Sequence, residues 1–287
     1  MKYKEPLFRP PAEADSLIFQ VAYSCPHNTC SFCRMYKGVR YSQRSADEVF
    51  EDIAWAAKRY PQSRRIFLAD GDVMFLKFDL LVEILEELNS KFANLARVNL
   101  YANGSSILAK SADQLCELRR LKLNTLYMGL ESGDEDVLKL VTKNETAEDM
   151  IKAANFAQSH GLKCSVMALL GLGGKEFSAK HAKLTASALN RMQPRLLSIL
   201  RFIEVPGTKM HAGFQPLSEY EAVEELEMII SGLDLKKTVF TANHASNPIP
   251  LKGRLPHDKF SILNYLKTML ESGELDSSGP GRVPIYL

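Results

Sequence analysis

The sequence predicts an α/β fold with parallel strands and with helices outside the sheet. Six times along the chain, a short apolar run typical of a buried strand is followed by an amphipathic helical pattern. Repeated β-then-α units favour a parallel sheet, because a crossover through a helix returns the chain to the same end of the sheet. Six such units could close as part of a barrel or lie open as a doubly wound sheet, and periodicity alone does not choose between them.

Four of the predicted strands lie in the first half of the chain. They are expected at residues 16–23, 64–69, 96–102 and 124–132, with helices at 45–60, 78–92 and 111–121. Two of these helices begin with a capping box, in which a serine and a residue three positions later satisfy each other's backbone N–H groups. The pairs are Ser45 with Glu48 and Ser111 with Gln114.

The second half of the chain continues the alternation and then changes character. Helices are predicted at 147–160, 175–192 and 218–233, and strands at 163–174 and 195–205. The polar, proline-punctuated stretch 241–259 is expected to be a long irregular loop, of the kind that often carries function. We therefore divide the chain into an N-terminal segment (1–15), a core (16–234) and a C-terminal extension (235–287) that covers the barrel or packs beside it.

The composition is that of a soluble globular protein. With 36 Lys and Arg against 34 Asp and Glu, the net charge is +2, so no overall electrostatic footprint points to nucleic acid. No apolar run approaches the roughly 20 residues that a membrane-spanning helix needs, and the N-terminus lacks the apolar core of a secretory signal. A cytoplasmic location is the default expectation. The five cysteines, an odd number, argue against a disulfide framework.

Polar or glycine-rich residues follow every predicted strand. The first strand runs into a cysteine loop, and the later ones end in "DGD" (70–72), "NGSS" (103–106), "ESGD" (131–134), "GLGG" (171–174) and "EVPG" (204–207). In barrels and in open α/β sheets alike, ligands bind at the carboxyl ends of parallel strands. These turns therefore predict one binding site on one rim.

Three cysteines, Cys25, Cys30 and Cys33, fall within nine residues and have no fourth beside them. A structural zinc site is closed by four ligands, and an iron–sulfur cluster usually takes four cysteines. His27 could be a fourth ligand, but it lies inside the loop, where simultaneous ligation is awkward. A metal centre with an open coordination position is typical of catalysis.

The cysteine spacing resembles that of the radical SAM superfamily, whose hallmark is usually C-x3-C-x2-C with an aromatic residue just before the last cysteine. Here the first gap is one residue longer, and Phe32 is that aromatic. The resemblance implies a partial (β/α)6 barrel and a [4Fe–4S] cluster held by Cys25, Cys30 and Cys33. It also implies that the open iron binds S-adenosylmethionine (SAM), whose reductive cleavage gives a 5′-deoxyadenosyl radical that takes hydrogen from a substrate.

The resemblance extends to the turns after the second, third and fourth strands, where the family contacts SAM. The matching residues are Asp70, Gly71 and Asp72, where a G-G-E-like turn receives the SAM amino group; Tyr101, Asn103 and Ser105, near the ribose; and Glu131 and Ser132, available to SAM hydroxyls or its methionine end. For "DGD" the alternative is an ordinary polar turn, and for Glu131 it is a structural hydrogen bond.

Later positions carry further candidates. Gly171 resembles the glycine that packs beside adenine, although the usual downstream glutamate is missing and a plain tight turn is an equal alternative. Arg201 is placed to meet a carboxylate. In the C-terminal stretch, His244 and Asn247 are candidate catalytic residues that contact substrate, the alternative being a loop packed on the barrel's flank. His181 is expected to be a surface or packing histidine.

The sequence thus favours a radical SAM enzyme acting on an unidentified substrate, with a net outcome of an oxidoreductase, a lyase or a transferase. The alternative is a non-catalytic iron–sulfur or zinc-binding protein, such as an electron carrier. We expect a small-molecule substrate rather than a nucleic acid or a membrane, and reduced flavodoxin or ferredoxin as electron donor.

A basic run near the cysteines forms either a solvated face or a surface for an anionic substrate or the electron donor: Arg34, Lys37, Arg40 and Arg44. The two remaining cysteines, Cys116 and Cys164, lie in apolar-periodic contexts and are expected to be buried core thiols.

Overall fold

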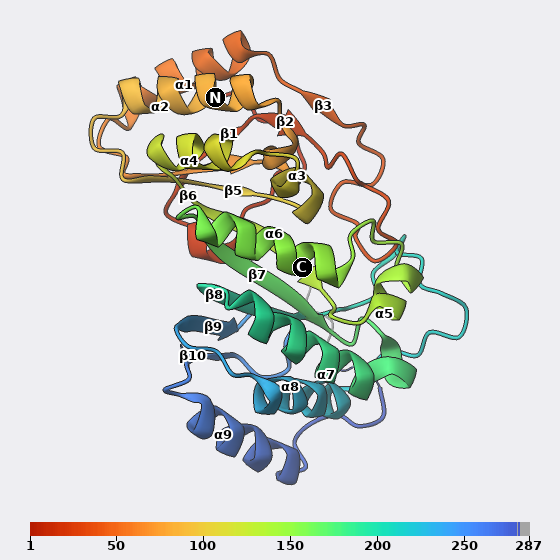
Figure 1. Ribbon diagram of the computed structural model, residues 1–287. Helices are drawn as coiled ribbons and strands as arrows, with labels where there is room; N and C mark the ends of the chain where they lie inside the picture. Colours follow the sequence, from red (N-terminus) through yellow and green to blue (C-terminus); the bar gives the residue numbers. More distant parts are fainter. Residues whose placement is uncertain (280, 282–287) are drawn as a thin grey trace. The chain divides into compact units, whose positions relative to one another are not determined.

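The computed structural model describes residues 1–279 and 281 of the chain (Figure 1). They form two compact units, each built from several stretches of chain. The first unit contains Met1–Asn28, Met35–Met128 and Ala153–Cys164; the second contains Thr29–Arg34, Gly129–Lys152 and the chain from Ser165 onward. Strands and helices alternate in both units and most strand pairs are parallel, so the predicted α/β class is confirmed.

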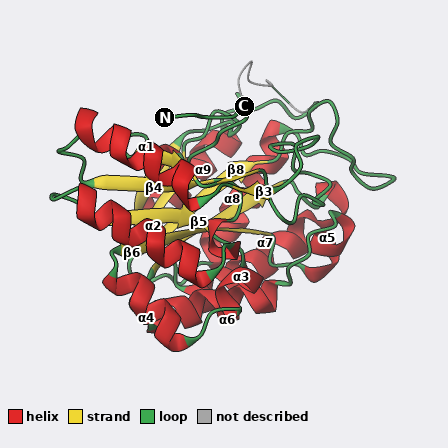
Figure 2. Cartoon of the chain, turned by 90° about the horizontal axis from the view of Figure 1, so that it is seen from above, coloured by secondary structure: helices red, strands yellow, loops and turns green. Residues whose placement is uncertain are grey.

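The main strands of the first unit are all parallel. They are β1 (Leu17–Gln20), β4 (Arg65–Ala69), β5 (Arg97–Tyr101) and most of β6 (Leu123–Glu131), paired in that order. The helices α1 (Ala46–Arg59), α2 (Phe78–Lys91) and α4 (Ala112–Arg120) flank them (Figure 2). Both predicted capping boxes are confirmed, with the two reciprocal hydrogen bonds present at the start of α1 and of α4.

The predicted strand 16–23 is broken at Val21. Its N–H group donates to the carbonyl of Ala69 at 2.7 Å, and beyond it β2 (Ala22–Tyr23) leaves the main sheet to pair antiparallel with β3 (Ser42–Gln43). The chain therefore turns away from the sheet just before the cysteine loop. Three short helices of the first unit were not predicted, because each is little more than one turn: η1 (Pro11–Glu13), η2 (Val73–Phe75) and α3 (Gly104–Leu108).

The second unit continues the alternation. It contains the end of β6, most of β7 (Lys163–Leu170), β8 (Leu196–Arg201), β9 (Thr238–Ala242) and β10 (Leu251–Leu255), with β7, β8, β9 and β10 in that order. Its helices include α5 (Glu135–Leu140), α7 (Gly174–Met192), α8 (Glu219–Gly232) and α9 (Lys259–Glu271). Helix α6 (Ala147–Ser159) has residues in both units. Helix α8 packs beside α7 and also beside α9 (Figure 1).

The prediction of a long irregular loop at 241–259 is wrong. The segment contains the end of β9 and all of β10, which pair antiparallel and add two strands next to β8. Only the ends of β10, Leu251 and Leu255, are buried, so its sequence "LKGRL" lacks the apolar run that marks a strand. The irregular parts are residues 243–250, which join the two strands, and the turn at 256–258 that leads into the next helix.

The prediction for the two isolated cysteines is half right. Cys164 is fully buried on β7, whereas Cys116 is exposed on α4. On that helix Leu115 and Leu118 form the buried stripe, and Cys116 lies one position off it. Within the described residues, no helix has both the length and the apolar character that crossing a bilayer requires.

The two thiols should differ sharply in reactivity. Burial raises the pKa of Cys164 to about 12, so almost no thiolate is present there at pH 8. Brief treatment of the native protein with N-ethylmaleimide at pH 8, followed by peptide mapping, should modify Cys116 and leave Cys164 unmodified. In urea both should react. Modification of native Cys164 at the rate of Cys116 would contradict the burial of β7.

Candidate functional site

Cys25 lies directly against the "DGD" turn that follows β4. A Cβ atom on Gly71 would be 2.6 Å from the Cβ of Cys25, closer than real side-chain contacts allow, and 3.1 Å from the Tyr36 ring, which is a tight contact. Only glycine therefore lets this turn approach the first cysteine of the loop. The structure thus brings together two predicted site residues of the first unit.

Asp70, the first carboxylate of this turn, is buried and fixed on both oxygens. Gln20 Nε2 donates to Oδ2 at 2.8 Å and the Tyr36 hydroxyl donates to Oδ1 at 3.1 Å. Burial raises the pKa of Asp70 to about 6, although these hydrogen bonds oppose the shift. Gln20 in turn exchanges two hydrogen bonds with the backbone of Lys4. Neither Gln20 nor Tyr36 was predicted; the signal for Gln20 is a polar residue inside the apolar run "LIFQVAY".

Asp72, the second carboxylate, contacts His27 of the cysteine loop. Its Oδ2 lies 3.1 Å from His27 Nε2 and accepts from the Ser106 hydroxyl at 2.5 Å, while Oδ1 accepts from the Asn103 N–H at 3.3 Å. The His27 ring also packs edge-on against Phe75 at 5.9 Å between centroids. His27 is thus held toward the "DGD" and "NGSS" turns of the first unit.

The three ribose candidates lie in different surroundings. Tyr101 packs in an aromatic cluster with Phe67 and Tyr127, at 5.0 and 6.3 Å between ring centroids, and burial raises the pKa of its hydroxyl. Asn103 is half-buried and joins Asp72 through its backbone, and Ser105 is exposed in the first turn of α3. Their contact with SAM remains a prediction.

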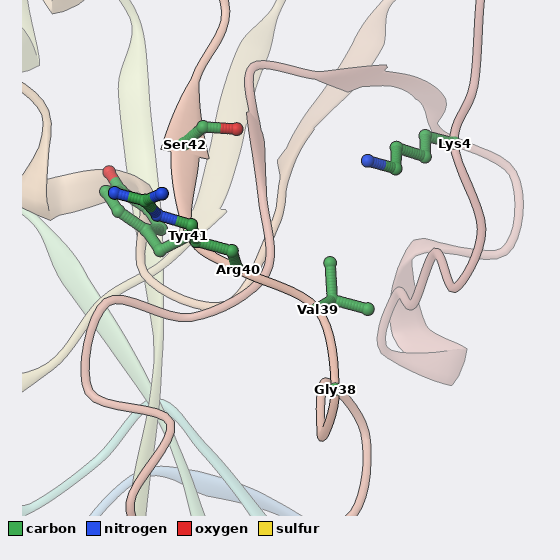
Figure 3. Close-up of a pocket in the computed structure, with 6 residues that line it drawn as sticks. All are labelled: Lys4, Gly38, Val39, Arg40, Tyr41 and Ser42. Atoms are coloured by element: carbon green, nitrogen blue, oxygen red, sulfur yellow. The ribbon is translucent and has the colours of Figure 1, made fainter.

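A shallow cavity of about 500 Å³ borders residues 38–42, next to the cysteine loop. In Figure 3 the Lys4 side chain extends toward this segment. The predicted basic run is not one patch: Arg44 is buried and pairs with Asp52 at 2.8 Å, and Lys37 donates to the Asn28 carbonyl. Of that run, only Arg40 lines the cavity.

The later part of the cysteine loop belongs to the second unit. Phe32 packs against a buried cluster of Val137, Val141 and Leu172, and the last of these lies in the "GLGG" turn. Next to it, the Ser31 N–H donates to the Val141 carbonyl at 2.9 Å. The predicted aromatic residue thus anchors the segment between Cys30 and Cys33 to the turn after β7.

Glu131 ends β6 in the left-handed region, with φ of 63°. Gly129 makes room for it, because a Cβ there would collide with the Glu131 carboxylate. The Lys143 ammonium lies 4.0 Å from Oε1, and burial raises the pKa of the carboxyl while Lys143 opposes the shift. This geometry turns the chain sharply at the rim.

Ser132 is fully buried and begins a chain of hydrogen bonds. The histidine expected at the surface or in packing, His181, is also fully buried: its Nδ1 lies 2.7 Å from Ser132 Oγ and its Nε2 lies 3.1 Å from the Leu169 carbonyl. Because a carbonyl only accepts, Nε2 carries the proton, and in the neutral ring Ser132 therefore donates to Nδ1. Ser132 Oγ accepts in turn from the Asp134 N–H at 2.9 Å.

Glu225 of α8 lies beside His181 and binds Gly171. Its Oε1 accepts from the Gly171 N–H at 2.7 Å and lies 3.5 Å from His181 Nε2, while its Oε2 accepts from the Ser178 hydroxyl at 2.5 Å. Burial raises the pKa of this carboxyl, opposed by His181 and the two hydrogen bonds. Sequence analysis missed Glu225, although a glutamate on the apolar stripe with Ala222, Leu226 and Ile229 was a signal.

The last candidates gather at the end of β8. The Arg201 guanidinium donates to the Leu217 carbonyl at 2.6 Å, and its backbone N–H donates to Ser246 Oγ. His244 Nδ1 lies 2.8 Å from the same Ser246 Oγ, and burial lowers the pKa of the imidazole. The Asn247 amide nitrogen donates to the Ile199 carbonyl at 2.8 Å, and its buried oxygen has no hydrogen-bond partner among the described residues.

The chemistry of the donor set suits an iron–sulfur cluster. Three half-buried thiols share one loop, and the glycine cradle at Gly71 holds the first of them. Within the described residues, no three His, Cys, Asp or Glu side chains converge on a single ion position. Cysteine thiolates are the ligands that iron–sulfur clusters take from proteins, and Cys25, Cys30 and Cys33 supply three of them.

Replacing Gly71 should impair cluster binding. Gly71→Ala introduces a methyl group where Cys25 lies, so we expect the iron bound after anaerobic reconstitution to fall by at least half. Gly279→Ala is the matched control, because its Cβ would meet nothing closer than 3.7 Å. Iron and sulfide analysis measures the effect. Full iron content in Gly71→Ala would show that the turn shifts to accommodate the methyl group and that cluster binding does not depend on Gly71.

Glu131 should make stability depend on pH. Because burial raises its pKa above the ordinary 4.5, the folded state keeps a proton that the unfolded chain has lost. This contribution favours folding at low pH and is lost as the pH rises through the folded-state pKa. Above pH 4.5, the unfolding free energy of Glu131→Gln should therefore rise relative to that of the wild type, by up to about 1.4 kcal/mol per pH unit.

Urea denaturation between pH 4.5 and 8 measures this difference. The control is Glu224→Gln, which removes an exposed carboxyl and should run parallel to the wild type. If the Glu131→Gln curve also runs parallel, the side chain is solvated in the folded state.

The chain shares sequence with curated proteins over much of its length. An uncharacterized protein from Methanocaldococcus jannaschii is 25% identical over 290 residues, covering 91% of this chain and 56% of that protein. A probable threonylcarbamoyladenosine tRNA methylthiotransferase from Pyrococcus abyssi is 24% identical over 200 residues, covering 67% and 45%. The chain spans about half the length of these relatives.

A solved structure shows the fold of the chain, and a family sequence pattern shows its family. The structure of anSMEcpe with bound AdoMet superposes with a TM-score of 0.60 at 13% identity, covering 75% of this chain and 59% of that one. This likeness confirms the fold class that the resemblance implies, a partial (β/α)6 barrel. The sequence pattern of the Radical SAM superfamily, whose cofactors are a [4Fe–4S] cluster and SAM, matches residues 19–182, more than half of the chain. The chain therefore belongs to the radical SAM superfamily.

Proposed function

We propose that this protein is an enzyme that cleaves SAM reductively to a 5′-deoxyadenosyl radical, which abstracts hydrogen from a substrate. The observation that carries the proposal is the three-cysteine loop, whose first member rests on a turn that only glycine can form. Family membership supports it. The bound cluster and SAM supply the radical chemistry, and the protein binds, orients and shields them.

The proposed assignments follow the turns. Cys25, Cys30 and Cys33 hold the cluster, and the "DGD" turn faces the SAM amino group. The carboxylates of that turn support this role, because their hydrogen bonds hold both ends of the turn in place. The "ESGD" and "GLGG" turns are proposed to hold the hydroxyls and adenine of SAM. His244 and Asn247, joined to the end of β8, are proposed to contact the substrate.

For the substrate we propose a small molecule. The near-neutral charge of the chain supports this, because nucleic-acid binders usually carry a basic surface. The relative that is named as a tRNA-modifying enzyme keeps the tRNA alternative testable. We propose reduced flavodoxin or ferredoxin as the electron donor. The exposed Lys4 and Arg40, which line the cavity beside the cysteine loop, suit the acidic surfaces of such carriers.

The decisive experiment is an anaerobic SAM-cleavage assay. Wild-type protein reconstituted with iron and sulfide should form 5′-deoxyadenosine from SAM when dithionite is added. Cys30→Ala should form none above background, whereas Cys116→Ala, which removes an exposed thiol outside the loop, should match the wild type. Chromatography of the nucleoside gives the result. A protein that binds about four irons but forms no 5′-deoxyadenosine is an electron carrier instead.

A further inference from the structure

Buried contacts among Ser132, His181, Glu225 and Gly171 connect the turn after β6 with the turn after β7; His181 and Glu225 lie 3.5 Å apart, and the other two links are hydrogen bonds. We propose that His181 and Glu225 are positioning residues that hold these two turns in the arrangement that binds SAM. This inference rests on the proposed function. It assigns a role to two side chains that take no direct part in the radical chemistry. We call the four residues the brace.

The brace joins the turns through side chains from two helices. His181 of α7 contacts Ser132 with one ring nitrogen and the Leu169 carbonyl, just before the "GLGG" turn, with the other. Glu225 of α8 accepts from the N–H of Gly171, a residue in the left-handed region with φ of +74°. The turn after β6 is thus bound to α7 and the turn after β7 is bound to α8. These two helices pack against each other.

Neither His181 nor Glu225 can act directly on a substrate. The serine, histidine and glutamate resemble a hydrolase triad in type, but all three side chains are fully buried. Ser132 Oγ already donates to the imidazole and accepts from the Asp134 N–H. A nucleophile needs access to its electrophile, which this hydroxyl lacks.

Stability alone does not account for the brace. Burying a carboxylate costs free energy that hydrogen bonds repay only when their geometry is good, and apolar side chains of similar size often replace buried polar networks with no loss of stability. A directional network does fix geometry, because each bond is satisfied in only one arrangement. The backbone N–H of Gly171 is therefore held at one place and angle, which apolar packing would not specify.

The held turn also supports the cysteine loop. Leu172 follows Gly171 directly, and Phe32, the residue before Cys33, packs against the cluster that contains Leu172. Movement of the "GLGG" turn would therefore disturb the proposed adenine site first and the cysteine loop second. The primary effect of breaking the brace should be weaker SAM binding.

The test uses the reconstituted holoenzyme and one set of variants at Glu225. Glu225→Leu keeps the volume and removes the acceptor for the Gly171 N–H, so the KM for SAM in 5′-deoxyadenosine formation should rise at least tenfold. Its kcat at saturating SAM should stay within threefold. Glu225→Gln retains a carbonyl that accepts from Gly171 and should restore KM to within about threefold of wild type. Glu224→Leu, the same change at the exposed neighbouring position, should leave KM unchanged.

Iron content and thermal unfolding separate positioning from a general loss of structure. Should Glu225→Leu fail to fold, Ser178→Ala removes one hydrogen bond to the same carboxylate and should raise KM about threefold with an unchanged unfolding temperature. A folded, iron-replete Glu225→Leu or Ser178→Ala with wild-type KM would overturn the brace while the proposed function stands. A wild type that forms no 5′-deoxyadenosine would overturn both.

Discussion

The structure depends on one constraint, which is that a carboxylate removed from water must have its oxygens hydrogen-bonded. Asp70, Asp72 and Glu225 are all fully or almost fully buried, and each binds atoms from distant parts of the chain. The cost of leaving such a group unpaired exceeds the free energy of most single contacts, so the surrounding backbone adapts to the carboxylate. The "DGD" turn after β4 and the "GLGG" turn after β7 thereby become fixed points between a strand and the helix that follows it.

The same constraint explains how the longer cysteine loop is accommodated. A loop with one extra residue has more conformations to lose on folding, and the extra length must be tied down somewhere. Here His27 contacts Asp72, and the Asn28 side chain donates a hydrogen bond to the Tyr36 carbonyl. The lengthened part of the loop is thus attached to the turn on which Cys25 rests.

Much of the fold could be predicted from the sequence, because apolar runs and helix caps are local signals. The alternation of strands and helices, the start of α1 at Ser45 and that of α4 at Ser111 all depend on neighbouring residues. Strand β10 escaped prediction because its pairing with β9, not its own composition, makes it a strand.

The partners of the site residues could not be predicted in the same way. Gln20 and Asp70 are 50 positions apart, and Gly171 and Glu225 are 54 apart. Nothing local to either residue specifies such a pair. A polar residue on an apolar stripe indicates only that some partner exists; the topology decides which one it is.

The C-terminal hairpin has a consequence for solubility. Strand β10 pairs with β9 along one side, and its opposite side ends the strand order of the second unit among the described residues. An open strand edge invites pairing with other chains, and exposed charges are the usual protection against it. On β10, Lys252 and Arg254 are exposed, so two like-charged side chains would meet their counterparts if two molecules paired edge to edge. The polar character that hides this strand from sequence analysis is the same property that protects the protein from aggregating along it.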